Sequence, residues 1–525
     1  MAEIETTKSI NEKNNEITES LSQDEATEES PLKCENDSNV KNENLTKTLS
    51  LREKLKNIKD NITVEPIMAC YIMPSVLASL ATQNLNLEKV CLVNLKYSVE
   101  ICDALKSRQT ENYTVYEENV QTYTAEMQAW KNVVQTAIPV LIILFVGAWS
   151  DKTGCRKACI LIPIIGEFIT CIGFIINTYF FYELPAEVAA LTESIFPAIT
   201  GGWFTNFIGV FSYIGDITTV EDRTYRVGIV NLFMSLGYPI GSALSGVLLT
   251  WIGYYGIFSL SASLYLFSLV YGYFYLEDPK RKQIKNKQTG CCGFLREFFD
   301  VALVIETFKV AFKKGTGNRR LRVCLLLIVV CVVFGPLQGE FTILYLFTRF
   351  RFNWDEVKYS VWSTYSIVTN LMGTAFSMSL FSKYLKLDDT LLGIISCMSK
   401  IIASFAYAFA RNDLEIYLAP LLEILNGTSF IAMRSIATKL VSGEEFGKVN
   451  SLFGLAEAMT PLVYGPLYSR VYIATLSVLP GAVFLLGALL TVPAVIIFGW
   501  LYFEHKKDRM LKEVNTNDSE MSQTC

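Results

Sequence analysis

Twelve long apolar segments constrain what this sequence can fold into more than any other feature. Each is about 20 residues long, the length an α-helix needs to cross the apolar core of a bilayer. A chain cannot keep so much apolar surface in water, so the sequence predicts an all-α polytopic membrane protein with transmembrane helices in two groups of six. The segments lie at 64–83, 129–149, 158–180, 191–215, 226–250, 256–276, 321–347, 357–381, 389–410, 414–438, 449–473 and 478–503.

The composition agrees with a membrane protein that has polar ends. Hydrophobic residues make up 51% of the chain and charged residues 18%, and the mean hydropathy is +0.32. Residues 1–62 contain no aromatic residue and are rich in Asn, Glu, Ser, Thr and Lys. Such a stretch cannot bury enough apolar surface to fold, so we expect a disordered tail and not a cleaved signal peptide.

The distribution of Lys and Arg predicts the orientation in the membrane. Basic residues gather in alternate short loops, as in 152–157, whereas the loops 181–190 and 251–255 contain none. Because cytosolic loops carry the excess of Lys and Arg, both termini are predicted to be cytosolic. The loop 348–356 is an exception to this pattern, because it lies on the outer side and carries two arginines.

These assignments divide the chain into five parts. Between the two bundles, the residues at 294–312 alternate apolar and charged side chains, which predicts an amphipathic helix on the inner leaflet and contact with membrane lipid. The parts are a disordered cytosolic tail at 1–62, a six-helix bundle at 63–276 with an outer loop at 84–128, a cytosolic linker at 277–320, a second bundle at 321–503 and a cytosolic tail at 504–525.

The outer loop carries two kinds of modification site. Asn112 begins an Asn-Tyr-Thr sequon on the side of the membrane where glycosylation occurs. Cys91 and Cys102 share this loop and face an oxidising compartment, where they either form a disulfide or remain free thiols.

Charge and residue counts exclude several classes of protein. The net charge of −5 leaves no basic excess for a phosphate backbone, so no nucleic-acid partner is expected. The 13 Cys include no C-x-x-C pair, and no metal or cofactor is predicted. No nucleophile–base pair points to an enzyme. The one histidine, His505, lies in the polar C-terminal tail, so proton chemistry inside the membrane must use carboxylates.

A charged, glycine-containing loop joins the second and third segments. It reads GAWSDKTGCRK at 147–157. Gly147 lets two helices approach closely and Gly154 permits a tight turn. Asp151 can lie against a helix N-terminus and Arg156 can bind a carboxylate at another helix end. This loop resembles the G-x-x-x-D-x-x-G-R-K motif of the major facilitator superfamily, and the resemblance implies two six-helix bundles that rock around a central cavity.

Three further stretches narrow the resemblance. The stretches 216–226, 338–345 and 434–441 look like the branch that contains the proton-coupled folate transporter and the thymic stromal cotransporter. The membrane histidine of that branch has no counterpart here, nor has the cysteine that would tether the loop 348–356 to the first outer loop. The resemblance implies an inner latch, the gating residues being Gly147, Asp151, Gly154, Arg156, Asp216 and Arg226.

Ionisable residues within the apolar segments are candidates for the transport site, because they are costly to keep in a membrane. Arg434 can bind a substrate carboxylate or phosphate, or form a salt bridge with Glu457. Glu340 can carry a proton, bind a substrate amine or bond a neighbouring hydroxyl. Glu423 precedes Arg434 by three helical turns, about 16 Å, so both would line one cavity.

Two other ionisable residues, Glu167 and Lys400, are expected to form structural pairs or to face the lumen. The substrate-binding candidates are therefore Arg434, Glu340, Glu423 and Glu457, with Glu340 as the proton-coupling residue.

The sequence thus predicts an alternating-access secondary transporter. Its expected substrate is a small organic anion, folate-like or otherwise carrying a carboxylate or phosphate, moved together with protons. An uncoupled facilitator on the same fold and a transporter-like receptor or scaffold are the alternatives. The plasma membrane is favoured over the endolysosomal membrane.

Overall fold

A computed structural model describes residues 63–218, 220–278, 318–440 and 443–523, with isolated positions between 299 and 313. The predicted tail at 1–62 and most of the linker with its amphipathic helix lie outside these residues. The described residues belong to one unit, Ile62–Cys525. All regular structure in these ranges is helical, as the apolar segments predict, and they contain no strand.

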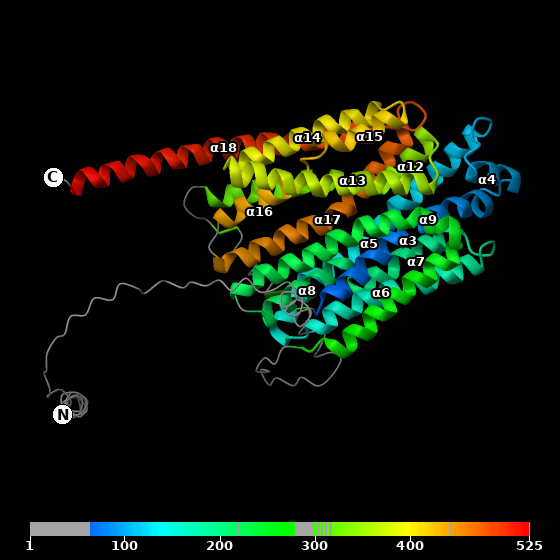
Figure 1. The fold of residues 1–525 in the computed structure, drawn as a ribbon, viewed down its shortest axis with the longest axis horizontal. Helices are drawn as coiled ribbons and strands as arrows, with labels where there is room; N and C mark the ends of the chain where they lie inside the picture. Colours follow the sequence, from blue (N-terminus) through cyan, green and yellow to red (C-terminus); the bar gives the residue numbers. More distant parts are fainter. Residues whose placement is uncertain are drawn as a thin grey trace, which may run out of the picture. The chain divides into compact units, whose positions relative to one another are not determined.

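The helices form two halves, one from each group of apolar segments (Figure 1). The first half contains α3 (Glu65–Lys89), η1 (Val90–Asn94), α4 (Val99–Lys106), α5 (Thr114–Thr153), α6 (Arg156–Tyr179), α7 (Ala186–Thr200), α8 (Gly202–Ile217) and α9 (Val220–Tyr275). The second half contains α12 (Arg319–Phe352), α13 (Glu356–Ser377), η2 (Met378–Tyr384), α14 (Asp389–Phe409), α15 (Asp413–Leu422), α16 (Thr428–Leu440), α17 (Gly443–Thr475) and α18 (Ala482–Gln523).

Seven helices in the described part of the chain are long and apolar enough to cross a membrane. Each of the twelve predicted segments falls largely on helical residues, although several are divided differently from the prediction. The segments 226–250 and 256–276 both lie in α9, which is interrupted at Gly253, where φ is 64°. An L-residue with a side chain rarely adopts this φ, so glycine allows the chain to turn between the two helices.

Two predicted segments are each broken into a pair of helices. The segment 191–215 is broken between α7 and α8 at Gly201, where φ is 85°. The segment 414–438 is broken between α15 and α16 at residues 423–427. Each break interrupts the helical hydrogen bonds inside an apolar segment, which membrane proteins tolerate where other protein groups satisfy the freed backbone.

Serine side chains of α14 donate hydrogen bonds to backbone carbonyls at the second break. Ser396 Oγ donates a hydrogen bond to the carbonyl of Asn426 at 2.7 Å and lies 2.8 Å from that of Leu425. Ser399 Oγ donates to the carbonyl of Leu422 at 2.5 Å. The break is therefore a defined structure held by α14, and it fixes the position of the residues within it.

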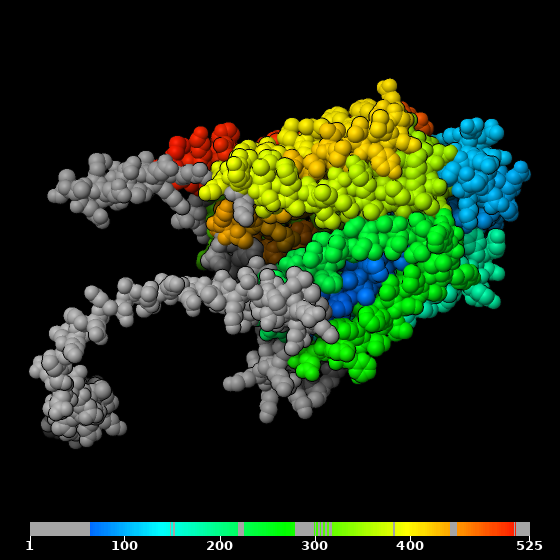
Figure 2. Space-filling model, viewed as in Figure 1, coloured from blue at the N-terminus to red at the C-terminus, as the bar shows by residue number. Residues whose placement is uncertain are grey.

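The two halves meet through α5 against α17 and α9 against α13. One apolar cluster contains residues of both halves, among them Leu80 and Val120 with Tyr472 and Phe484. It lies at the end of the bundle that carries α4, which we call the disulfide end; the opposite end, where α5 meets α6, is the linker end. Figure 2 shows α13 and α9 in contact along this side of the molecule.

The predicted outer loop at 84–128 is mostly helical. Helix α3 continues through η1 to Asn94, α4 occupies Val99–Lys106 and α5 begins at Thr114. The reason is burial: Glu117, Val120 and Gln121 of α5 are at most 3% exposed, and Glu117 bonds to the second half.

The contact between α9 and α13 leads to a test of the closed disulfide end. A Cβ added at Gly246 of α9 would lie 2.8 Å from Val357 Cα and would overlap the Glu356 carbonyl. We predict that Gly246→Ala lowers the unfolding midpoint in detergent, because overpacking against backbone costs about 1–3 kcal/mol. Gly228→Ala, in the same helix with no atom within 4 Å, should leave the midpoint unchanged or raise it. Equal midpoints for the two variants would contradict this prediction.

Candidate transport site and gates

A buried cluster of three charges occupies the second half, and we call it the second-half triad. Lys400 of α14 lies between two carboxylates: its Nζ is 2.5 Å from Glu340 Oε2 of α12 and 2.9 Å from Glu423 Oε1 at the helix break. Lys400 is 4% exposed and Glu340 7% exposed. The structure therefore brings together two predicted site residues and one, Lys400, for which the sequence predicts only a structural pair or a lumen-facing role.

The surroundings leave one carboxylate oxygen of the triad without a partner. Glu340 Oε1 is buried and accepts no hydrogen bond from a described residue, and the nearby Tyr468 hydroxyl is likewise unpaired there. Glu340 Oε1 packs directly against Gly487 of α18, where a side chain would not fit, because an added Cβ would overlap this oxygen. Glu423 Oε1 also accepts a hydrogen bond from Asn426 Nδ2 at 3.0 Å.

Two carboxylates and one ammonium give the triad a net charge of −1 when all three groups are ionised. An uncompensated charge in an apolar interior is costly, so uptake of one proton makes the triad neutral. The unpaired Glu340 Oε1 is the oxygen that can take this proton without losing an existing hydrogen bond. The arrangement is therefore suited to hold one exchangeable proton.

Arg434 of α16 lies apart from the triad and is partly exposed. Its Nη2 is 2.8 Å from Glu457 Oε1 of α17, and its Nη1 donates to Asn450 Oδ1 at 3.1 Å. The Arg434 side chain is 44% exposed. The salt bridge expected as an alternative for Arg434 is therefore present, and the guanidinium still faces open space.

The expected spacing of Glu423 and Arg434 along one helix is wrong. That estimate assumes an unbroken helix, whereas α15 ends at Leu422 and α16 begins at Thr428. The break turns Glu423 toward Lys400, and Arg434 lies one further helix along. Glu423 therefore lies in the break and Arg434 on α16, and each has a different charged partner in this conformation.

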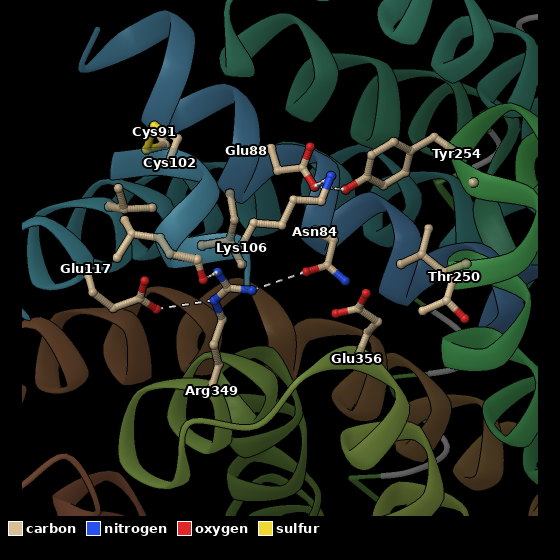
Figure 3. A pocket seen from close by; sticks show the side chains of 15 residues that line it. Asn84, Glu88, Cys91, Cys102, Lys106, Glu117, Thr250, Tyr254, Arg349 and Glu356 are labelled. Atoms are coloured by element: carbon tan, nitrogen blue, oxygen red, sulfur yellow. Dashed lines mark hydrogen bonds and ion pairs between the residues drawn. A yellow bond between two sulfur atoms is a disulfide. The ribbon is translucent and has the colours of Figure 1, made fainter. Parts of the chain in front are cut away.

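A second polar cluster, the disulfide-end clamp, joins the two halves (Figure 3). Arg349 of α12 is 6% exposed; its Nε lies 3.2 Å from Glu117 Oε1 of α5, and its Nη2 donates to the Leu105 carbonyl at 3.1 Å. The Tyr345 hydroxyl donates to Asn84 Oδ1 of α3 at 2.6 Å. These bonds close the disulfide end between the halves.

Arg108 adds a second cation to the clamp. Its Nη2 donates to Asn353 Oδ1 at 3.0 Å, and Asn353 Nδ2 donates to the Arg108 carbonyl at 2.6 Å. Burial and the neighbouring Arg349 lower the pKa of Arg108 to about 10, so it remains charged at neutral pH. The tether between the first outer loop and the residues after α12 is thus polar in this chain, which has no cysteine at 348–356.

Sequence reasoning missed Arg349, although one signal pointed to it. Arg349 lies in a loop that the distribution of basic residues assigns to the outer side, where Lys and Arg are rare. The structure explains the exception, because Arg349 is buried against Glu117 and is not a surface charge.

A cavity of about 370 Å³ lies beside the clamp. Lys106 Nζ is 3.0 Å from Glu88 Oε1 on its wall, and the Tyr254 hydroxyl donates to the same carboxylate at 2.6 Å. Its lining includes Glu117, Arg349 and both cysteines but no residue of the second-half triad. The cavity therefore belongs to the disulfide-end gate and not to the predicted midplane site.

The two cysteines of the first outer loop form a disulfide, Cys91–Cys102, which decides between the two alternatives left by the sequence. The disulfide links η1 to α4 above the cavity (Figure 3). Asn112 lies in the exposed turn before α5, a position open to the predicted glycosylation.

The predicted latch residues lie at the linker end, within the first half. Arg156 Nε is 2.8 Å from Asp216 Oδ2 of α8, and its Nη1 donates to Ser150 Oγ at 2.8 Å. Gly154 ends α5 with a φ of 75°, as its predicted turn requires. The side chain of Asp151 lies outside the described part of the structure.

The structure also places two other gating candidates, Arg226 and Gly147. Arg226 bonds to Glu65 Oε1 at 3.1 Å and to Thr63 Oγ1 at 3.0 Å, at the start of α3. An added Cβ at Gly147 would meet no described atom within 4 Å. Among the described residues, no close helix approach is made at Gly147 in this conformation, and its gating role stays a prediction.

A comparison with protein families gives one match that covers most of the helical region. Residues 71–423 match the model of the Major Facilitator Superfamily. This range begins in α3 and ends at the break after α15, so it includes the loop at 147–157 and all three residues of the second-half triad. Among the described residues, no group of three or more His, Cys, Asp or Glu side chains is arranged to hold a metal ion.

Curated relatives belong to solute carrier family 46. The chain is 23% identical over 458 residues to the probable peptidoglycan muropeptide transporter SLC46 of Drosophila melanogaster, covering 85% of this chain and 86% of the relative. It is 26% identical to the human lysosomal proton-coupled steroid conjugate and bile acid symporter SLC46A3, covering 68% of this chain and 76% of the relative. These relatives agree with the branch that the sequence stretches resemble.

Solved structures with the same fold are more distant in sequence. A mutant of the nucleoside transporter NupG is similar with a TM-score of 0.57 at 14% identity, covering 83% of this chain and 99% of that chain. A POT family transporter in complex with a thioalcohol-conjugated peptide has a TM-score of 0.53 at 13% identity, covering 83% of this chain and 96% of that chain. Both are similar in fold alone.

The charge balance of the second-half triad leads to a stability prediction. Lys400→Met leaves two buried carboxylates without a cation, so we expect a loss of about 3–5 kcal/mol, measured as a lower unfolding midpoint in detergent at neutral pH. The double variant Lys400→Met with Glu340→Gln should recover part of this loss.

The matched control is Lys439→Met, which breaks a 2.6 Å pair with Asp389 on a side chain that is 63% exposed. Exposed pairs contribute about 0–1 kcal/mol, so its midpoint should change little. A Lys400 variant as stable as this control would show that the triad is not a charge-balanced unit.

Proposed function

The chain belongs to the Major Facilitator Superfamily, and from this premise we propose that it is a proton-coupled symporter of organic anions. Its relatives make it a membrane transporter of the solute carrier 46 type. The proton coupling, the class of substrate and the residues that bind each are our proposal. One observation carries it: a buried ammonium, Lys400, is shared by two carboxylates in the second half.

In the proposed cycle, a proton and an anion enter the second half together. Protonation of Glu340 at Oε1 removes one of the two negative charges that surround Lys400. The ammonium then has capacity for a negative group of the substrate, while Glu423 keeps its 2.9 Å contact. Binding of the anion alone would add charge to an already negative site, so the proton is required for binding. This requirement is the physical basis of coupling.

Arg434 is the proposed contact for the anion on the linker side of the second-half triad. Its guanidinium is 44% exposed and held by Glu457, so a substrate carboxylate, sulfonate or phosphate can compete with Glu457 for the same hydrogen bonds. Relatives are named for bile acids, steroid conjugates and muropeptides. Bile acids are amphipathic organic anions, and we propose this class ahead of folate-like anions.

The two gates are proposed to open in turn. The disulfide-end clamp, centred on Arg349 and Glu117, closes the side from which substrate enters. The Arg156–Asp216 pair, with Gly147, Asp151, Gly154 and Arg226, forms the latch that holds the linker end closed when the clamp opens. Rocking of the two halves exchanges these contacts.

The disulfide end is proposed to face the lumen or the cell exterior, with both termini cytosolic, because a disulfide persists in an oxidising compartment. The sequence favours the plasma membrane, whereas relatives such as the human symporter are named lysosomal. We therefore propose an endolysosomal membrane, whose acidic lumen supplies the proton gradient. If the tagged protein does not co-localise with lysosomal markers, this location is wrong.

The proton role of Glu340 is tested in proteoliposomes with radiolabelled taurocholate as the probe. Wild-type uptake should accelerate when the outside is made acidic and should slow when a protonophore removes the gradient. Glu340→Gln cannot exchange a proton at this position, so the response of its uptake to the gradient should be clearly smaller than that of the wild type.

The matched control for this assay is Glu415→Gln, an exposed carboxylate of α15, which should retain the response. Uptake by the wild type that ignores both pH and protonophore would favour an uncoupled facilitator. Binding of the probe without any flux would favour a receptor or scaffold.

The substrate role of Arg434 gives a separate prediction. Charge-assisted hydrogen bonds contribute about 1.5–3 kcal/mol, so Arg434→Ala should reduce taurocholate uptake at least about tenfold at unchanged membrane expression. The exposed Arg470 of α17 provides the control, and Arg470→Ala should transport normally. Normal uptake by Arg434→Ala would remove Arg434 from the substrate site.

A further inference from the structure

The first half contains its own buried ion pair, which the transport mechanism above does not use. The Nζ atom of Lys131 in α5 lies 2.7 Å from Glu193 Oε1 in α7. The Lys131 side chain is 7% exposed and that of Glu193 23% exposed. Within the described part of the chain, Glu193 Oε2 is buried and has no hydrogen-bond partner. This pair lies in predicted apolar segments, where charged groups are rare and usually functional.

A second carboxylate faces this pair. The Glu167 carboxylate of α6 makes no hydrogen bond or ion pair with any described residue, and it is within electrostatic range of Glu193. The other groups that face Glu167 are the hydroxyls of Tyr71 from α3 and Tyr265 from α9, and the thiol of Cys171 from α6. Among these groups in the described part of the chain, Lys131 is the cation, and it is paired with Glu193.

Lys131, Glu193 and Glu167, which we call the first-half triad, repeat the composition of the second-half triad. Each triad has two carboxylates and one ammonium, each has a carboxylate bonded to the ammonium at 2.5–2.9 Å, and each leaves one buried carboxylate oxygen unpaired among described residues. Each therefore carries a net charge of −1 when fully ionised. The same cost of an uncompensated buried charge applies to both.

A contact between the halves connects the two triads. Asn132, the residue after Lys131, has its Nδ2 at 3.5 Å from Thr342 Oγ1, two residues after Glu340. Asn132 also packs against Gly465 of α17, where an added Cβ would lie 2.9 Å from Asn132 Cβ. Helix α5, which carries Lys131, and helix α12, which carries Glu340, are thus in contact next to these two residues.

We propose that the first-half triad is a second proton-binding site, which accepts one proton on the carboxylate pair Glu193 and Glu167. Uptake of this proton makes the triad neutral, and its release restores the charge of −1. Proton binding follows from the first-half triad alone. Its consequence for transport rests on the proposed function: each cycle then carries two protons with the anion, one for each half.

The first experiment measures proton binding without any substrate. Infrared difference spectra of the purified full chain in lipid, recorded between neutral and acidic pH, report the C=O stretch of carboxyl groups that become protonated. Glu193→Gln and Glu167→Gln each leave a neutral pair with Lys131, so each should remove the same buried carboxyl band. Glu187→Gln, in the same helix as Glu193 but bonded to Asn94 and Tyr123 at the disulfide end, should retain it.

The outcome is decisive in either direction. A band that is lost in both triad variants and kept in Glu187→Gln supports the second site. A spectrum that is the same in the wild type and both triad variants overturns it. The two variants remove different carboxylates, so misfolding of one leaves the other to decide. The Glu340→Gln variant removes a separate band if the second-half triad also binds a proton, which keeps the two assignments distinguishable.

The second experiment measures the number of protons per anion. Reversal potentials of taurocholate flux in proteoliposomes, set by known pH and anion gradients, should give two protons for the wild type and one for Glu193→Gln. One proton in the wild type, with the gradient response intact, rejects the second site while keeping the proposed function. If taurocholate flux does not depend on the pH gradient, the proposed function is wrong. The infrared spectra then decide alone whether the first-half triad binds a proton.

Discussion

The cost of an unbalanced charge in an apolar interior governs the arrangement of this protein. Lys400 is 4% exposed, and removing such an ion from water costs several kcal/mol unless partners surround it. Two carboxylates within 2.9 Å provide those partners and leave one negative charge over. This site becomes neutral only when it binds a proton or another cation that compensates the extra negative charge. The proposed chemistry of coupling is therefore a consequence of how the fold keeps a lysine in the membrane.

The same principle explains why the two halves meet where they do. Arg349 and Glu117 come from different halves and are both nearly inaccessible to water, so each requires the other while the disulfide end is closed. In the proposed cycle, opening this end exposes both to water, which solvates them and offsets the lost ion pair. A salt bridge that can exchange its partner for water suits a gate, whereas an apolar contact of the same area would have no such alternative. At the linker end, the Arg156–Asp216 pair lies within one half and remains intact in this conformation.

The sequence predicts the helices and part of the site, and the reasons for its limits are physical. Apolar length marks each membrane segment because the bilayer imposes it locally, and the loop at 147–157 carries its family signature within eleven residues. Glu340 stands out because a carboxylate in an apolar segment is costly wherever the segment lies. The pairing of Glu340 with Lys400 joins residues 60 positions apart, and no local pattern encodes which charge meets which. Arg349 appears in the sequence only as an exception to a rule about orientation.

The broken helices show how local sequence and distant packing combine to make the site. Gly201 ends α7 in the first half, and the turn at 423–427 separates α15 from α16 in the second. These are the fourth predicted segment of each half, and each carries a carboxylate of its triad, Glu193 or Glu423. A continuous helix bonds its own backbone and holds its side chains at fixed angles. A break releases the backbone, which serine side chains of α14 then bond, and α14 also supplies Lys400. The groups that repair the break and the group that balances the charge thus come from one helix, so a movement of α14 against the break changes hydrogen bonding and charge balance together.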